Sequence, residues 1–509
     1  MKSERTITLI SAILTLALSP TLNSQNISIT SSAREQNIRY KVVFIGTFGG
    51  PNSHFSIFGA HILNNDGSFV GWADDSLPDP FGLIYGPDAC WDGDCFVARG
   101  FLWKNEEMAD LGALASGFSS DVSWMSASGL ISGEAQTGEV DPSVGWTMHG
   151  ILWAHGQMID LGTLDGGAIS LTTSVNNSAE VAGFALNTVP DPYSMFGVNQ
   201  TRAYRWKNGV MRDLGTLGGP DAMALRINER GQIAGNSYVN WDLSDFCVLR
   251  TGGFLWAHGK MTDVGGFGGT CTTVSDMNNR GQIVGGSLLA GDQAQHGFLW
   301  QNGKMTDLGT LGGNFASAVA ISEAGDVVGL QTLPGNDSIF HAALWERGKI
   351  FDIGALQTGG CSLATSVNSH LQVVGINSSD CDFNDDPSLR AIISEGGGPA
   401  IDLNTLIPAD SGVELRNASI INERGEIVAV GVYPDGNHGP VLLIPCERES
   451  DQADTCRNVG APPLGTRSVP AFAQTNDKRP QWLSDTGGMV GTSLQNKHYF
   501  GPVSRIGKR

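Results

Sequence analysis

The sequence predicts an all-β protein, a β-propeller of four-stranded blades, and three observations support this prediction. The first is composition: glycine accounts for 68 of the 509 residues and charged residues for only 16%. Such a composition favours tight turns and short strands over long solvated helices. The second is a motif that recurs along most of the chain. The third is that the two ends of the repeated region carry the two halves of one strand pair.

The motif starts with a Phe-Leu-Trp segment and continues, across a turn, into a Met-x-Asp-Leu-Gly segment. An aspartate follows each repeated tryptophan after seven residues. An Asn-Gly or His-Gly pair between them, such as Asn208-Gly209, is typical of a tight hairpin, because glycine accepts a positive φ. The repeated residues are Trp103, Trp153, Trp206, Trp256, Trp300 and Trp345, and Asp110, Asp160, Asp213, Asp263, Asp307 and Asp352.

A second hairpin follows each of these pairs and completes the unit. In one copy ALRIN (224–228) is expected to pair with QIAGN (232–236), and a glycine closes the hairpin 22 or 23 residues after the aspartate. Four short strands in a unit of 40 to 50 residues are typical of a propeller blade. Residues 39–445 hold eight such units, with seven blades as the alternative count. A β-solenoid or a row of separate sheets fits less well, because solenoid coils are shorter and lack paired hairpins.

The end units indicate that the array closes. The region opens with YKVVFIG (40–46), which resembles the Met-x-Asp-Leu-Gly strand, and ends with GPVLLIP (439–445), which stands where Phe-Leu-Trp would be. These two strand types pair in every internal hairpin, so the first strand can bond to the last and leave no open sheet edge.

Packing and turn formation explain the repeated residues best. We expect each repeated tryptophan to pack between blades, and each repeated aspartate to accept backbone N–H bonds in a turn. Trp72 lies outside the series, beside a long insertion, and is expected to matter much less to stability.

The pattern resembles the bacterial HAF-repeat family of probable extracellular repeat proteins. The resemblance rests on FLWQNGKMTDLGTLGG (298–313) and INERGQIAG (227–235) and covers about residues 39–445. The His-Ala-Phe triplet is never intact; His341-Ala342-Ala343 and His296-Gly297-Phe298 come nearest. The resemblance implies a secreted repeat fold and no established activity.

The segments outside the repeats are expected to be an export signal, a linker and a C-terminal tail. Residues 1–24 are predicted to be a signal peptide, with an apolar stretch at 7–18 after Lys2 and Arg5. Residues 25–38 are a linker, and 446–509 are a tail with a possible partial repeat. The protein is therefore expected to be secreted or periplasmic, and no stretch is long enough for a membrane span.

Eight cysteines agree with an oxidising compartment and with disulfides that pin loops. Alternate connections of an up-and-down sheet emerge on one side, which favours the pairs Cys247–Cys271 and Cys361–Cys381. Cys90–Cys95 and Cys446–Cys456 would close local loops, and other pairings remain open.

The connection before each Phe-Leu-Trp strand varies most in length. From the closing glycine to the next tryptophan the distance ranges from 15 to 32 residues. Length variation on one rim of a rigid scaffold favours a binding face there, although insertions that are merely tolerated are the alternative.

Motifs of known chemistry are scarce, and no catalytic residue is predicted. No H-E-x-x-H, G-x-S-x-G or phosphate-binding loop occurs in the sequence. Two loops are acidic: residues 72–95, and the segment with Asp380, Asp382 and Asn384. The second is a weak calcium candidate, because the glycine of a calcium loop is missing and Ala391 replaces its last acidic ligand. A solvated acidic loop is the alternative, and no other cofactor is expected.

These observations favour a secreted, monomeric, non-enzymatic scaffold that binds an extracellular glycan or protein. The alternative is a hydrolase or lyase acting on an extracellular polysaccharide, which would need converging carboxylates near the central channel. The net charge of −20 argues against nucleic acid and against an anionic membrane surface as partners.

Overall fold

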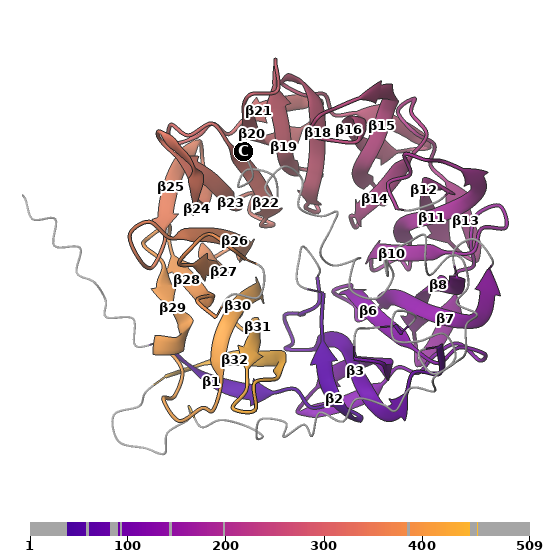
Figure 1. The fold of residues 1–509 in the computed structure, drawn as a ribbon, viewed down its shortest axis with the longest axis horizontal. Coiled ribbons are helices and arrows are strands. Elements are labelled where there is room, and N and C mark those ends of the chain that lie inside the picture. The colour runs from indigo at the N-terminus through magenta and orange to yellow at the C-terminus, as the bar shows by residue number, and fades with distance from the viewer. Residues whose placement is uncertain are drawn as a thin grey trace, which may run out of the picture. The chain divides into compact units, whose positions relative to one another are not determined.

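A computed structural model describes residues 38–56, 61–81, 90–91, 94–141, 145–196, 199–383, 387–447 and 456. The described residues belong to the unit Ile38–Arg509, and they form a β-propeller whose small antiparallel sheets follow one another around a ring (Figure 1). The predicted signal peptide, most of the predicted linker, and the tail apart from Cys446, Glu447 and Cys456 lie outside the described residues.

The strands come in sets of four, and each set contains the two hairpins that the motif predicts. The first four sets are β2 (Gly49–His54), β3 (Phe69–Pro78), β4 (Phe96–Lys104), β5 (Glu107–Asp110); β6 (Ser120–Met125), β7 (Ile131–Asp141), β8 (Gly145–Ala154), β9 (Gln157–Asp160); β10 (Ser170–Val175), β11 (Val181–Pro190), β12 (Asn199–Lys207), β13 (Val210–Asp213); and β14 (Ala222–Ile227), β15 (Ile233–Leu243), β16 (Leu249–Ala257), β17 (Lys260–Asp263). Strands such as β6 and β10, the first of their sets, lie nearest the centre of the ring (Figure 1).

The remaining strands continue the same order. They are β18 (Gly268–Met277), β19 (Ile283–Leu289), β20 (Gln295–Gln301), β21 (Lys304–Asp307); β22 (Ala316–Ile321), β23 (Val327–Leu333), β24 (Asn336–Glu346), β25 (Lys349–Gly354); β26 (Cys361–Val367), β27 (Gln372–Ser378), β28 (Arg390–Glu395), β29 (Ile401–Asp402); and β30 (Glu414–Ile421), β31 (Ile427–Val432), β32 (His438–Glu447) with β1 (Ile38–Phe44). A short 3-10 helix, η2 (Leu403–Thr405), follows β29.

Counting sheets and counting sets give different numbers. Hydrogen bonding defines six four-stranded sheets and one eight-stranded sheet among the described residues. The large sheet contains two consecutive sets, which a single parallel bridge between Thr251 and Cys271 joins. The sequence-based figure of eight blades therefore stays a prediction.

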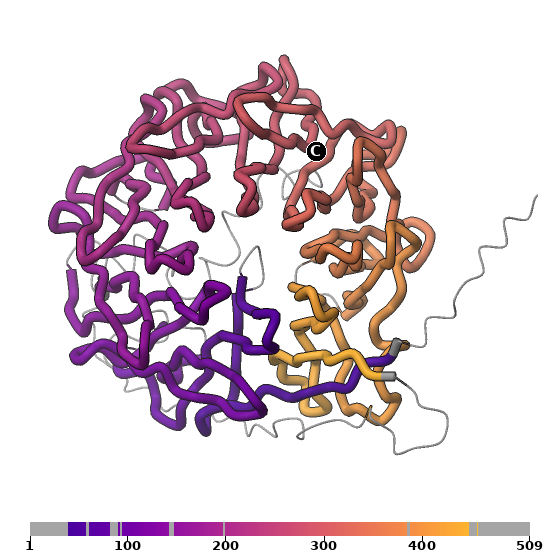
Figure 2. Tube along the Cα trace, turned by 180° about the vertical axis from the view of Figure 1, so that it is seen from behind, coloured from indigo at the N-terminus to yellow at the C-terminus, as the bar shows by residue number. Residues whose placement is uncertain are grey.

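The first and last strands close the ring, as the end units predicted. β1 pairs antiparallel with β32 over seven residues, from Ile38–Glu447 to Phe44–Val441. Figure 2 shows β1, at the indigo end of the described chain, running beside β32 at the yellow end. A side chain joins the same two sets, because Asn422 Nδ2 donates to the carbonyl oxygen of Asn64 at 2.9 Å.

The Asn422 bond is one of a series that links neighbouring sets through the turns between their first and second strands. In each case the Nδ2 of an asparagine donates to a backbone oxygen in the corresponding turn of the next set. The pairs are Asn64–Ser126, Asn176–Asn228, Asn278–Ser322, Asn368–Asn422 and Asn422–Asn64. Because the last pair returns to the first set, the series contributes to ring closure.

Backbone geometry explains two of the recurring residue types. Asn208 and Gly209 have φ values of 51° and 79°, as a tight hairpin with two left-handed residues requires. The closing glycine of each second hairpin lies opposite a bulge: a Cβ at Gly133 would lie 2.1 Å from the Asp121 carbonyl oxygen, and one at Gly183 would lie 2.0 Å from that of Leu171. No side chain fits there, so the close approach of the neighbouring strand's backbone requires glycine at this position.

The core lies between neighbouring sets, and the repeated tryptophans contribute to it. Trp103, Trp206, Trp300 and Trp345 are buried, whereas Trp153 and Trp256 are partly buried against the same kind of cluster. The cluster around Trp103 contains side chains from the last set and the first two sets, so it forms the core at the closure.

Trp72, which was expected to matter much less to stability than the repeated tryptophans, is buried. Its side chain is 7% exposed, as is that of Trp300. Trp72 belongs to an apolar cluster that also contains Phe81, Trp91 and Ala98, so described residues of the loop after β3 and of β4 cover its side chain.

Candidate functional site

The connections divide into two groups that lie on opposite sides of the sheets. We call the hairpin face the side with the turns between first and second strands and between third and fourth strands. The loop face carries the connections between second and third strands and those between sets. The disulfides Cys247–Cys271 and Cys361–Cys381 each join a connection of the loop face to a strand that begins at the same face. Cys271 and Cys361 lie at the beginnings of β18 and β26 rather than in the preceding loops.

All four cysteine pairs have the partners that the topology favoured. Cys90–Cys95 and Cys446–Cys456 close short segments, with sequence separations of 5 and 10. Four disulfides fit an extracellular or periplasmic protein. Within the described residues, no helix combines the length and the apolar character that crossing a membrane requires.

The repeated aspartates are turn residues, as expected. In each of the six, Oδ1 accepts a hydrogen bond from the backbone N–H two residues later, at 2.7–2.9 Å. Three of them also bind a histidine on the neighbouring strand, in the pairs His149–Asp160, His296–Asp307 and His341–Asp352. Because the pairs recur at equivalent positions, they belong to the scaffold.

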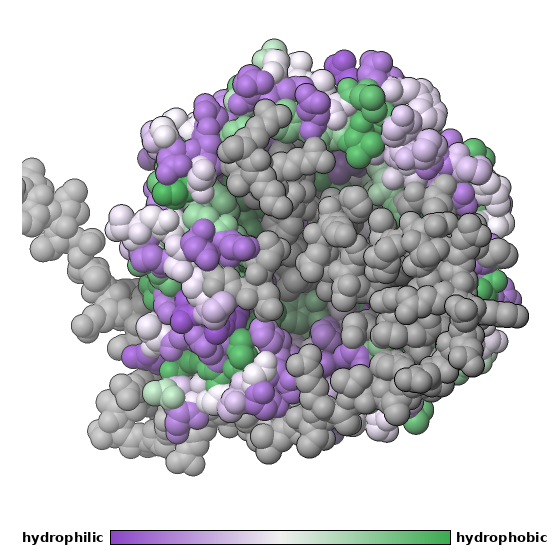
Figure 3. All heavy atoms as spheres, viewed as in Figure 1, coloured by the Kyte–Doolittle hydropathy of each residue, from purple (hydrophilic) through white to green (hydrophobic). Residues whose placement is uncertain are grey.

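Exposed apolar side chains gather on the loop face. Nine of the eleven large apolar side chains that are exposed among the described residues lie there, and Ile159 and Val210 lie on outer strands. The nine are Leu77, Phe118, Val140, Val189, Tyr193, Trp241, Leu243, Val248 and Leu311. On the face drawn in Figure 3, hydrophobic residues are exposed in separate patches among hydrophilic ones.

Five of the nine lie on the loop-face side of the third and fourth sets, and we call them the apolar rim: Val189, Tyr193, Trp241, Leu243 and Val248. The rings of Tyr193 and Trp241, from adjacent sets, lie edge to face with centroids 6.4 Å apart. Trp241 is 57% exposed and Leu243 71% exposed. The rim therefore presents an aromatic pair with aliphatic neighbours to solvent.

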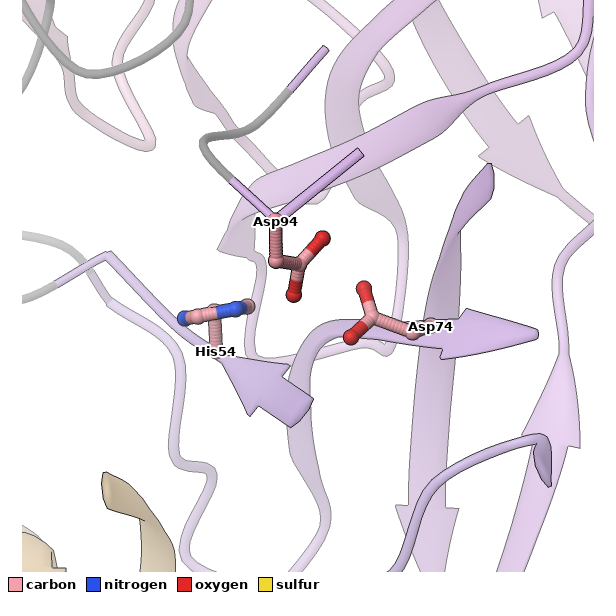
Figure 4. Close-up of side chains that lie close together, drawn as sticks. All are labelled: His54, Asp74 and Asp94. Carbon is pink, nitrogen blue, oxygen red and sulfur yellow. The ribbon is translucent and has the colours of Figure 1, made fainter. Parts of the chain in front are cut away.

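A second feature lies in the first acidic loop, where three side chains converge. His54 at the end of β2, Asp74 on β3 and Asp94 just before β4 each place one ligand atom within 4.8 Å of the other two. Figure 4 shows the imidazole and both carboxylates turned toward one another. Asp74 is completely buried, so this part of the acidic loop is not a solvated surface.

Neighbouring groups hold this cluster in place. The backbone N–H of Asn52 donates to Asp74 Oδ2 at 2.7 Å, and its Nδ2 donates to Asp94 Oδ2 at 2.6 Å. Trp72 stacks on the His54 ring at 5.8 Å. Burial and the nearby Asp94 carboxylate raise the pKa of Asp74 to about 9, and burial lowers the pKa of His54.

Two further carboxyl pairs are buried between strands. Glu134 Oε1 accepts from the Thr172 backbone N–H at 2.7 Å, and burial together with the Asp121 charge raises the pKa of Glu134. Asp221 accepts from the N–H groups of Met195 and Thr201, and burial raises its pKa to about 7, with a contribution from Asp191. Both pairs bind backbone donors, so they fix strands and loops.

Near the centre of the ring, side chains from different sets meet. The Arg226 guanidinium of β14 lies 4.9 Å from the ring centroid of Trp124 on β6, although a whole set separates these strands in sequence. Arg226 also donates to Asp276 Oδ1 on β18 at 2.9 Å. These contacts tie inner strands together across sets.

The calcium candidate is described only in part. Asp380 Oδ1 accepts from Ser378 Oγ and from the Asp382 backbone N–H, as in a turn, whereas Asn384 lies outside the described residues. Asp88 and Asp92 of the first acidic loop also lie outside them. A calcium site at 380–384 remains a prediction.

Sequence reasoning found the acidic loop but missed its partner. Asp74 and Asp94 stood out by composition, whereas His54 lies 20 residues before Asp74 in a separate strand. The available signal was topological: β2 and β3 are paired, so His54 lies opposite Trp72, two residues from Asp74.

No family model matches the chain, and no curated protein matches it. Solved structures resemble it in fold. The β-propeller domain of the Trilobed protease from Pyrococcus furiosus has 8% identity and a TM-score of 0.38, over 64% of this chain and 96% of that one. Porphyromonas gingivalis dipeptidyl peptidase 4 has 10% identity and a TM-score of 0.40, and the match spans 66% of this chain and about half (53%) of that one. A Dyadobacter fermentans protein of unknown function has 10% identity and a TM-score of 0.31, over 81% of this chain and all of that one.

Proposed function

We propose that the protein is a secreted, non-enzymatic binding scaffold that engages a protein partner through the apolar rim. The observation that carries this proposal is the concentration of exposed apolar side chains on the loop face, where nine of the eleven among the described residues lie. Exposed apolar patches on an otherwise polar surface mark interaction sites more often than chance allows.

The composition of the rim favours a protein over a sugar as the partner. Tyr193 and Trp241 are of the types that dominate binding energy in protein interfaces. Leu243, Val248 and Val189 extend the patch with aliphatic surface, which hydrophobic contacts can cover and sugar hydroxyls match poorly. The net charge of −20 disfavours polyanionic ligands.

The arrangement of carboxylates supports a non-enzymatic role. Asp121 with Glu134, and Asp191 with Asp221, accept hydrogen bonds from backbone N–H groups of strands and loops, so we assign them to the scaffold. We keep membership of the HAF-repeat family as a proposal, which rests on the segments 298–313 and 227–235.

A defined peptide library tests the proposal. Phage-displayed peptides selected on the full mature chain are expected to lose at least about tenfold in affinity for a Tyr193→Ser/Trp241→Ser variant, because both substitutions remove central aromatic contacts. The matched control is Ile159→Ser/Val210→Ser, which removes the two exposed apolar side chains outside the loop face and should leave the affinity unchanged.

Three outcomes would contradict the proposal. An equal loss of affinity in the control variant would show that nonspecific hydrophobic contact, not the rim, drives binding. Binding of a defined oligosaccharide on a glycan array, abolished by Trp241→Ser, would establish a sugar ligand. Cleavage of such a polysaccharide by the purified chain would establish an enzyme.

A further inference from the structure

We propose that His54, Asp74 and Asp94 bind one divalent transition-metal cation, best represented by Zn²⁺, at the loop-face end of the first set of strands. The site is separate from the apolar rim, so this inference does not depend on the proposed function.

The geometry fits a small cation with three protein ligands. The three ligand atoms lie within 4.8 Å of one another. Zinc bonds to histidine nitrogen and carboxylate oxygen of about 2.0–2.2 Å place tetrahedral ligands roughly 3.4 Å apart. Small side-chain rotations, inward from the positions in Figure 4, therefore bring the three atoms onto one ion.

Among the described residues, no hydrogen-bond partner is found for two buried atoms of the cluster. They are Asp74 Oδ1, on a completely buried residue, and His54 Nε2. Buried polar atoms are nearly always paired, because leaving one without a partner costs free energy. Both atoms belong to the same three-residue cluster, so one cation would satisfy both at once.

The surroundings already orient the ligands, as the outer groups of metal sites do. Asn52 donates to the second oxygen of Asp74 and to Asp94, and the Phe96 backbone N–H donates to Asp94 Oδ1 at 3.1 Å. The Cys90–Cys95 disulfide fixes the residue that follows Asp94. Such outer contacts reduce the entropy lost when a metal binds.

The donor set selects the class of metal. Calcium and magnesium prefer shells made of oxygen alone, whereas an imidazole nitrogen beside carboxylates suits zinc and its neighbours in the first transition row. Three protein ligands leave a fourth position for water. The bound cation would join β2, β3 and the end of the insertion before β4, and would thereby hold that insertion on the sheet.

Metal titration of the full mature chain, without an affinity tag and after treatment with a chelator, tests the site. Calorimetry is expected to show one Zn²⁺ per chain. His54→Gln and Asp94→Asn should each weaken zinc binding by about 100-fold or more, and Asn52→Ala, which removes an orienting contact, by about 10- to 100-fold. Co²⁺ should give the visible absorption of a tetrahedral site in the native chain, and this absorption should be lost in His54→Gln.

His296→Gln is the matched control, because it removes a histidine from a repeated His–Asp pair that no third potential ligand joins among the described residues. Zinc affinity should not change in this variant. Circular dichroism of every variant without metal establishes that it folds, and Asp94→Asn, at a partly exposed position, provides the measurement if His54→Gln does not fold. Three results would overturn the inference: an absence of zinc binding by the native chain, equal losses in His296→Gln and His54→Gln, or a preference for Ca²⁺ over Zn²⁺.

Discussion

The hairpin face and the loop face of this propeller are built from the same strands but differ in how much of their structure repeats. On the hairpin face, asparagine side chains join the turns of neighbouring sets by nearly the same bond, at 2.9–3.1 Å. On the loop face, the connections differ in length, two disulfides join them, and most exposed apolar side chains lie there. The comparison teaches that the repeated contacts between sets lie on one face, whereas the variable connections and most exposed apolar side chains lie on the other.

The loop face itself is uneven along the chain. Of its nine exposed apolar residues, eight precede residue 250 and only Leu311 follows it. The glycine-to-tryptophan distances are also longer in the first half, at 20 to 32 residues, than in the two units that end at Trp300 and Trp345, at 15 and 16. We therefore expect variants in the first four sets to affect binding most.

The largest predicted effect concerns the apolar core between the sets, which lies between the hairpin face and the loop face. Trp300→Ala should lower the free energy of unfolding by about 3–5 kcal/mol, because a buried aromatic side chain is lost and a cavity remains. Trp72→Ala should cost a similar amount, since both residues are 7% exposed. Urea titrations measure both values. A cost for Trp72→Ala within about 0.5 kcal/mol of zero, as at surface positions, would show that the insertion near Trp72 does not belong to the core.

The next effect is confined to the loop face. Replacing Cys361 and Cys381 by alanine should cost about 3 kcal/mol, because the bridge closes a segment of 20 residues in the unfolded chain. Hydrogen exchange should increase around Cys381 and the start of β26, while the hairpin turn at Asn302-Gly303 stays protected. An equal increase in hydrogen exchange on both faces would contradict the prediction that the disulfide stabilises the loop face alone.

A smaller effect is expected on the hairpin face. Asn422→Ala should cost about 1–3 kcal/mol, because it leaves buried partners unpaired at the junction of the last and first sets. Asn65 is the control: it accepts one bond from the Glu423 N–H at an exposed position, so Asn65→Ala should cost less. Thermal unfolding of the two variants compares them, and equal costs would mean that the buried Asn422 bonds do not stabilise closure.

The last predicted effect is a pH dependence of the loop face. The pKa of Asp221 in the folded protein is about 7, above its value of 3.8 in an unfolded chain, so the folded state holds this proton more tightly. Its contribution to stability is therefore full below about pH 4 and declines as the pH rises toward 7. Between pH 5 and pH 8 the urea midpoint should fall, and it should fall less in Asp221→Asn. If the urea midpoint of Asp221→Asn falls with pH as steeply as that of the native chain, Asp221 is excluded as the cause.

The sequence by itself determined the strand pairing within the repeated units and the pairing of the two ends. The fixed offset from tryptophan to aspartate predicted the outer hairpin, and the complementary end segments predicted that β1 would pair with β32. The side-by-side emergence of alternate connections predicted Cys247–Cys271 and Cys361–Cys381. These inferences succeeded because hairpin pairing depends on residues that are close in sequence. Since the unit repeats, the same pairing recurs in every unit of the ring.

Only the tertiary structure decided what lies between non-repeated segments. It packed Trp72 against Phe81 and Trp91, brought His54 to Asp74 and Asp94, and set Tyr193 against Trp241. Each of these contacts joins segments of unequal length that occur once, so no periodicity in the sequence encodes them. How an insertion folds depends on which surface it can cover and which buried polar groups it can pair, and both are defined only after the ring has closed.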